Sequence, residues 1–392
     1  MKQLLEKISL LSLSFMLVST FAVSPALPKM LEYYQGLGYT AGQVSFLFSV
    51  PSFAILSVLL LMPSLSKSLS DKFIIILGLV LITVGGTLPV FSQSYGMVFL
   101  GRLVLGLGIG FINAKAINLI SERFSGRERV KMLGIRGATE VLGSAVLTYL
   151  AGMLAEHDWP LAYLIYSFAL AVLLLYLSFV PKQKTTQVLE QTIQRSRFSW
   201  HQRLYLLAMA AYAGFVILIN SVSVLRIPLV VSQFHLGSSR QASLVLSLMM
   251  LMGIAAGMLF SYLSVYFKDY LMPFVLLVLS LGLYIMWQST TIWLLGLGAL
   301  VVGFIYTTGV VSVFQNISEN LPQPQLTLAT TGVLLGCNLG GGLSALVDHY
   351  LAQFSKDPRI SFAYLLFLSA SFSLVSYVRV ALKHRRKSVD KK

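Results

Sequence analysis

The chain has few of the residues on which several kinds of protein depend. It has one cysteine, Cys337, among 392 residues, so an internal disulfide or a cysteine-based metal cluster is excluded. Its five histidines do not cluster, and we expect neither a metal site nor a cofactor. There is no Gly-x4-Gly-Lys-Ser/Thr sequence and no conspicuous Ser/His/Asp arrangement, which argues against nucleotide hydrolysis and against an enzyme.

Charge is also scarce. Charged residues make up 11% of the chain and apolar residues 56%, far from the even mix of a soluble domain with a charged surface. The composition therefore argues against a soluble protein of this size.

Long apolar runs take the place of that polar surface. Six spans of about 20 or more residues precede a polar, basic stretch from Pro181 to Arg203, and six more follow it. Such spans cross roughly 30 Å of hydrocarbon as helices, where only helices or closed barrels satisfy their backbone groups. We predict an all-α membrane protein with twelve transmembrane helices in two six-helix bundles, residues 1–180 and 204–392, joined by a basic cytoplasmic linker, 181–203. The predicted spans are 8–31, 41–62, 73–92, 95–120, 132–155, 159–180, 204–231, 241–266, 271–289, 291–316, 325–350 and 360–381.

The first apolar run follows Lys2 and Lys7 and has some features of a signal peptide. It is longer than a typical signal, and no clear small-x-small cleavage site follows it. We interpret it as a retained helix.

The net charge of +15 indicates orientation. Most of the 29 lysines and arginines fall at the termini and in alternate loops, whereas the other loops and span ends hold Lys29, Arg240, Lys356 and Arg359. By the positive-inside rule, both termini face the cytoplasm of a multi-pass protein in the cell membrane. Nucleic acid is not an expected partner.

The two halves of the sequence are weakly similar at a period near 198 to 200 residues. Pro28 aligns with Pro228, and Leu37-Gly38-Tyr39-Thr40 aligns with Leu236-Gly237-Ser238-Ser239. We interpret the chain as a duplicated six-helix unit.

This organisation resembles the major facilitator superfamily along the whole chain. The fourth span contains Arg102 followed by glycines at 106, 108 and 110, which is similar to that family's fourth-helix pattern, and Ala26-Leu27-Pro28 is also similar. The loop after the second span departs from the family pattern, since Pro63, Leu65 and Lys67 stand at its positions and Asp71 comes late. Gly143-Ser144 is a reduced form of the fifth-helix signature of the drug/proton antiporter branch. The resemblance implies a secondary transporter.

Glu140 is the acidic residue nearest the middle of a predicted span. Because an unpaired carboxylate is costly there, it is neutral, paired or functional. A proton-coupling role is one interpretation. A structural pairing with Arg136, one turn earlier, or with Lys115 on the neighbouring span is the other, and the two are compatible.

Other polar residues in the spans are candidates for function. The resemblance implies that Arg102 transfers protons or stabilises one conformation, although it also suits a structural hydrogen-bonding role. Polar groups near the midplane either bind substrate or bond helix to helix. The residues to which this applies are Asn113, Asn220, Arg226, Tyr306 and Asn338.

A cytoplasmic gate is the last predicted site. The resemblance implies that Glu122 and Arg123, after the fourth span, pair with Lys67 and Asp71 in one conformational state. Exposed ion pairs are individually weak, so a solvated loop is the alternative.

Together these features predict a monomeric transporter. Its expected partners are a small-molecule substrate, protons and the lipid bilayer. The favoured activity is proton-coupled efflux of amphipathic or lipophilic molecules by alternating access. Uptake or exchange of a metabolite or organic anion, and a membrane sensor without transport, are the alternatives.

Overall fold

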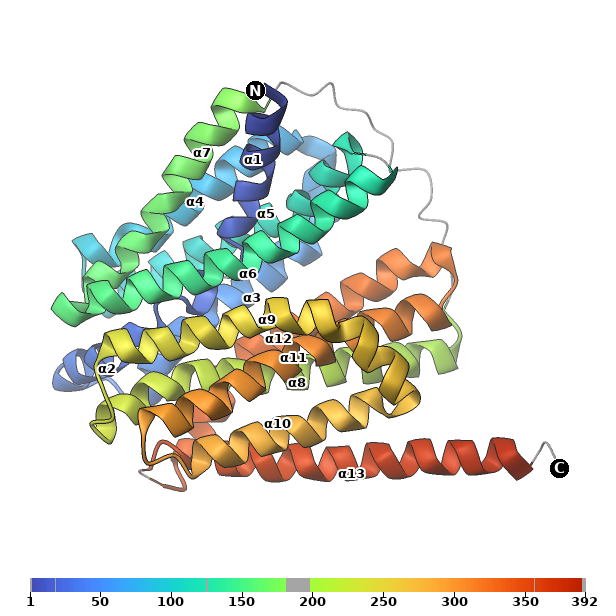
Figure 1. Cartoon of the computed structure of the whole chain (residues 1–392). Helices are drawn as coiled ribbons and strands as arrows, with labels where there is room; N and C mark the ends of the chain where they lie inside the picture. Colours follow the sequence, from blue (N-terminus) through green and yellow to red (C-terminus); the bar gives the residue numbers. More distant parts are fainter. Residues whose placement is uncertain (1, 18, 125, 181–197, 356, 390–392) are drawn as a thin grey trace.

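The computed structural model describes residues 2–17, 19–124, 126–180, 198–355 and 357–389. Within these residues the chain forms α-helices and short 3₁₀ segments, with no strand (Figure 1). Ten described stretches are long and apolar enough to cross a membrane, and one of them, Ser239–Trp287, contains two helices. The all-α membrane fold is confirmed, whereas the count of twelve spans stays a prediction.

The helices of the first half are grouped together in Figure 1, as are those of the second half. The first group comprises α1 Lys2–Phe15, η1 Ser19–Phe21, η2 Ser24–Ala26, α2 Leu27–Gly36, α3 Ala41–Ser68, α4 Asp71–Phe91, α5 Tyr95–Arg123, α6 Gly126–His157, η3 Trp159–Ser167 and α7 Phe168–Phe179. The second comprises α8 Trp200–Gln233, α9 Ser239–Phe267, η4 Lys268–Tyr270, α10 Leu271–Trp287, α11 Ile292–Asn320, α12 Gln323–Ala352 and α13 Ile360–Val389.

The segment between the two groups was predicted as the linker 181–203. Residues 181–197 of it lie outside the described part of the chain. The helix that follows begins at Trp200, four residues before the predicted boundary, because Ser199 and Gln202 form a capping box at its start.

The first predicted span is not one continuous helix, so that prediction is wrong. α1 ends at Phe15, and regular α-helix resumes only in α2. Pro25 and Pro28 stand in the first turns of η2 and α2, where the missing N–H of proline costs nothing. These prolines favour new helix starts at positions where hydropathy alone predicts a continuous span.

The turn that follows α2 in the first half recurs after α8 in the second half. α2 and α8 both end in a Schellman motif, with Tyr39 N–H donating to the Tyr34 carbonyl and Leu236 N–H donating to the Val231 carbonyl, both at 3.0 Å. The residue with positive φ is Gly38 in the first motif and His235 in the second. The next helix then begins with a capping box in each half, at Thr40 and at Ser238. The same turn chemistry therefore recurs at equivalent places.

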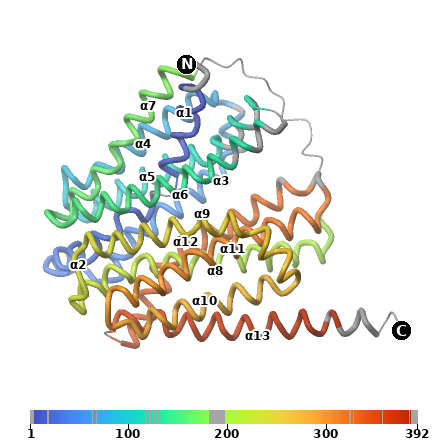
Figure 2. The backbone as a smooth tube through the Cα atoms, in the orientation of Figure 1, coloured from blue at the N-terminus to red at the C-terminus, as the bar shows by residue number. Residues whose placement is uncertain are grey.

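Each half has a large hydrophobic core of its own. The halves meet along two seams, where α6 packs on α9 and α3 packs on α12. Ser247 Oγ donates to the Ala145 carbonyl at 2.8 Å across the first seam, and Ser49 Oγ lies 3.4 Å from Ser344 Oγ across the second. Figure 2 shows the two groups of helices diverging toward the side where α1 begins and α13 ends, which we call the terminal side. The opposite side is called the remote side.

Candidate functional site

Glu140 lies on α6, the helix that forms one wall of the first seam. Its Oε2 is 3.2 Å from Arg136 Nη2 on the preceding turn of the same helix, and 26% of the Glu140 side chain is exposed. Of the two partners considered from the sequence, the structure therefore places Arg136 beside Glu140. Lys115 instead pairs with Asp71 at 2.5 Å.

Groups from the second half approach Glu140 across the seam. Tyr306 on α11 lies within electrostatic range of both Glu140 and Cys337. A methyl group added to Gly253 of α9 would lie 3.8 Å from Val141 and 3.1 Å from Thr307 Oγ1. Val141 and Thr307, which directly follow Glu140 and Tyr306 in the chain, therefore both lie next to Gly253 of α9. A carboxylate of the first half and a phenol of the second half therefore interact electrostatically where the two halves meet.

The predicted asparagines are spread over three helices. Asn113 on α5 and Asn220 on α8 are half-buried, and Asn338 on α12 donates to the Leu334 carbonyl of its own helix at 2.9 Å. The described contacts do not join these three side chains to one another. Their part in substrate binding stays a prediction.

Arg102 is enclosed by the first half, with 1% of its surface exposed. Its Nε donates to the Leu47 carbonyl at 2.9 Å, its Nη1 to the Tyr166 hydroxyl at 3.1 Å and its Nη2 to the Thr20 carbonyl at 2.6 Å. The guanidinium also lies 5.2 Å from the Phe48 ring. The backbone near Thr20 is not α-helical and lies inside the protein, so the Thr20 carbonyl has no N–H of an α-helix to accept from. Arg102 supplies the missing donor. The geometry favours the structural interpretation, and proton transfer by Arg102 stays a prediction.

Arg226 on α8 is paired with Asp348 on α12, and both are buried. Sequence reasoning missed this partner because Asp348 stands near the end of its span and was grouped with the span-end acids. The sequence did offer a signal. Asp348 is a carboxylate within the apolar stretch Leu328–Ala352, and Arg226 is a cation within another apolar span, so each needs a partner of opposite charge.

The predicted gate residues lie at the terminal side of the first half. Asp71 pairs with Lys115, and Arg123 pairs with Glu6 of α1. The side chains of Lys67 and Glu122 lie outside the described part of the structure. The described ion pairs thus join helices within one half, and a latch involving Lys67 stays a prediction.

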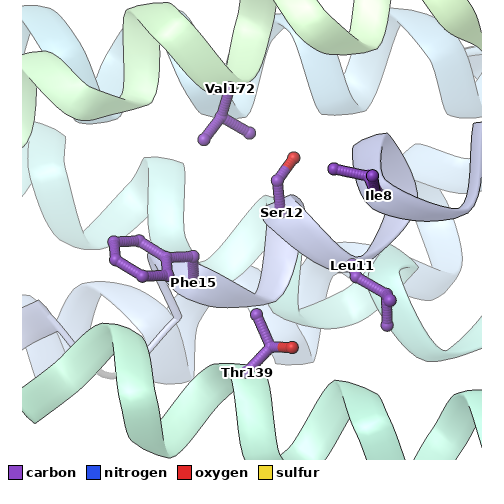
Figure 3. A pocket seen from close by; sticks show the side chains of 6 residues that line it. All are labelled: Ile8, Leu11, Ser12, Phe15, Thr139 and Val172. Carbon is purple, nitrogen blue, oxygen red and sulfur yellow. The ribbon is translucent and has the colours of Figure 1, made fainter. Parts of the chain in front are cut away.

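A cavity of about 300 Å³ lies on another face of α6, between α1 and α7 (Figure 3). Its two hydroxyl groups, on Ser12 and Thr139, donate to carbonyls of their own helices at 2.8 and 2.9 Å, so the walls present mainly apolar surface. Thr139 directly precedes Glu140. The residues that line the cavity are Ile8, Leu11, Ser12, Phe15, Thr139 and Val172.

Known proteins resemble this chain in sequence and in fold. The sequence profile of the Major Facilitator Superfamily matches residues 9–345. The MFS-type transporter ungB of Aspergillus violaceofuscus is 26% identical over 160 residues, and the riboflavin transporter RibZ of Clostridioides difficile is 22% identical over 142 residues. These segments cover 40% and 36% of this chain but 28% and 31% of those proteins.

Two solved structures have a similar fold. Both are of a bacterial homologue of the human lysosomal transporter Spinster in an inward-facing conformation. The occupied form has a TM-score of 0.76 at 11% identity, covering 95% of this chain and 96% of the other. The unoccupied form has a TM-score of 0.71 at 14% identity, covering 95% and 97%.

Proposed function

Because this chain belongs to the major facilitator superfamily, we propose that it is a secondary active transporter that exports small amphipathic or lipophilic molecules in exchange for protons. The two halves rock about the seams and expose a central site to each side in turn. We place the protein in the cell membrane with both termini in the cytoplasm, as the distribution of basic residues supports.

The position of Glu140 carries this proposal. A carboxylate at a seam between moving halves changes its surroundings when the halves move, because Tyr306, which interacts with it electrostatically, belongs to the other half. Its ion pair with Arg136 stays within one helix and therefore travels with it. Such a group takes up a proton in one state and releases it in the other, as exchange requires.

The arrangement of the halves supports an inward-facing state. They diverge toward the terminal side, which we assign to the cytoplasm, and the similar solved structures are inward-facing. Glu140 would then exchange protons with the cytoplasm in this state.

Transport of a metabolite is the second candidate, since one relative is named a riboflavin transporter. For an organic anion, the predicted positive charges were Arg102 and Arg226. Each is buried and hydrogen-bonded within its own half, so neither guanidinium is free to bind an anion between the halves, and this alternative has less support. A sensor without transport is the third candidate and predicts no flux.

The test is gradient-driven transport in proteoliposomes. A pH gradient is imposed and the flux of a lipophilic dye is followed for the native chain, for Glu140→Gln and for the control Glu319→Gln at the exposed end of α11. We expect flux in the native chain and the control, and loss of flux with retained dye binding in Glu140→Gln. Equal flux in all three would overturn Glu140 as the proton carrier. No dye flux in any of them, with gradient-driven riboflavin flux instead, would favour metabolite transport.

A further inference from the structure

At the remote side of the first seam, one carboxylate accepts a hydrogen bond from the other half. Glu156 stands in the last turn of α6, in the first half, and faces the start of α9, in the second half. Its Oε1 accepts a hydrogen bond from the backbone N–H of Arg240 at 3.2 Å, and the Ser238 hydroxyl lies beside the same carboxylate. Glu156 therefore bonds the start of a helix that belongs to the other half.

The start of α9 is suited to this contact. The first N–H groups of a helix have no partner within the helix, and the aligned peptide dipoles favour a negative charge there. Ser238 and Gln241 form a capping box in which the Gln241 N–H donates to Ser238 Oγ at 3.3 Å. The backbone N–H of Arg240 takes no part in this capping box and donates to Glu156 instead.

Neighbouring groups hold Glu156 in place. Lys29 of α2 donates to the Glu156 backbone carbonyl at 2.8 Å. Arg240 Nε donates to the Tyr149 hydroxyl at 3.2 Å, which is a further hydrogen bond between α9 and α6. A cavity of about 350 Å³ lies beside the contact and is lined by residues of both halves, including Lys29, Glu156 and His235. The charged and titratable groups around Glu156 are Lys29, Tyr149, His157, His235 and Arg240.

We propose that Glu156 is the latch that keeps the remote side closed, by capping the N-terminus of α9 across the seam. The contact joins the ends of α6 and α9 that lie farthest from the place where the halves diverge (Figure 1). Opening of the remote side separates these ends and breaks the bonds, so the latch stabilises the state in which the terminal side is open. This role requires two-sided access but neither a particular substrate nor proton coupling.

The test measures access to the seam without substrate. Ser243 on α9 is fully buried and packs on Gly152 of α6, so Ser243→Cys in a Cys337→Ser background places one thiol behind the latch. The rate of labelling by a membrane-impermeant thiol reagent is measured in that background and with Glu156→Gln added. We expect Glu156→Gln to raise the rate about two- to fivefold, the effect of one carboxylate at an exposed helix N-terminus.

Two further variants make the test specific. The control is Glu32→Gln, which removes one negative charge from an exposed position of α2. We expect its labelling rate to stay unchanged. If Glu156→Gln does not assemble, Ser238→Ala tests the same contact from the other half and raises the rate. An unchanged rate in the latch variants, or an equal rise in Glu32→Gln, would overturn the latch. Because labelling needs neither dye nor a pH gradient, this result is independent of the transport test on Glu140.

Discussion

Arg226 and Asp348 form an ion pair inside the second half, with 8% and 3% of their side chains exposed. The Nε of Arg226 donates to Asp348 Oδ1, and its Nη2 donates to the Asp348 carbonyl at 3.2 Å. The Ser361 hydroxyl donates to the same Oδ1 at 3.1 Å. The pair therefore joins α8, α12 and α13.

Removing one partner of this pair should be costly. Asp348→Ala leaves the Arg226 guanidinium buried without its counter-charge, and we expect the free energy of unfolding to fall by about 3 to 5 kcal/mol. Unfolding in detergent measures it. The control is Asp269→Ala, which breaks an exposed pair with His384 and should change stability little. Equal losses in the two variants would contradict the importance of burial.

Arg102 should not be replaceable by lysine. One ammonium group cannot reach the carbonyls of Leu47 and Thr20 and the hydroxyl of Tyr166 together, and we expect Arg102→Lys to cost about 1.5 to 3 kcal/mol of stability. Thermal unfolding compares it with Arg379→Lys on the exposed face of α13, where the change should be within about 0.5 kcal/mol. Native-like stability of Arg102→Lys would show that these bonds do not hold the irregular first span.

Two glycines of α12 form a matched pair. A Cβ on Gly340 would overlap the Gly214 carbonyl of α8, whereas a Cβ on Gly332 would meet nothing within 4 Å. We expect Gly340→Ala to destabilise by about 1 to 3 kcal/mol because α8 and α12 must separate. Gly332→Ala should be neutral or stabilising by up to about 1 kcal/mol, since alanine favours the helix. The free energy of unfolding of both variants is measured in the same detergent. A loss of stability in Gly340→Ala alone indicates close packing of α8 on α12, and an equal change in both variants would contradict it.

Asp357 gives a prediction for pH. Burial raises the pKa of this carboxyl, but hydrogen bonds from the Arg359 backbone and guanidinium, together with its charge, lower the pKa below the ordinary value. A group whose pKa is lower in the folded state adds stability above its unfolded pKa, about 3.9, and this stability is lost as the pH falls through the folded pKa. We expect Asp357→Asn to lower the unfolding temperature near neutral pH.

The difference between the native chain and Asp357→Asn should disappear in acid. Unfolding temperatures measured from pH 7 downward test this. A difference that stays constant to pH 3 would show that the carboxylate charge is not the cause.

Part of this architecture follows from composition and length. Apolar runs as long as those around Gly78 or Val302 cannot satisfy their backbone outside a helix in lipid, so the all-α fold was predictable. The break between Phe15 and Leu27 was not, because hydropathy averages over local turn chemistry. Pro25 and Pro28 stood in the sequence, but proline alone does not distinguish a kink from a new start.

The candidate site was predictable only as separate residues. Glu140 was noticed because its charge is isolated in its own span, and Arg136 because it lies one turn earlier. The approach of Tyr306 depends on how α6 and α11 each pack on α9, which no local pattern encodes. Glu156 and Ser238 were missed for the same reason, since each is an ordinary residue at the end of a helix.

The break in the first span also has a consequence for motion. Ser14 at the end of α1 and Ser24 in η2 have buried hydroxyls without a hydrogen-bond partner among the described residues. Thr20 in the same segment gives its carbonyl to Arg102, so the segment is held by a bond from another helix rather than by an α-helical ladder of its own. A displacement of Arg102 on α5 would therefore act directly on the backbone between α1 and α2.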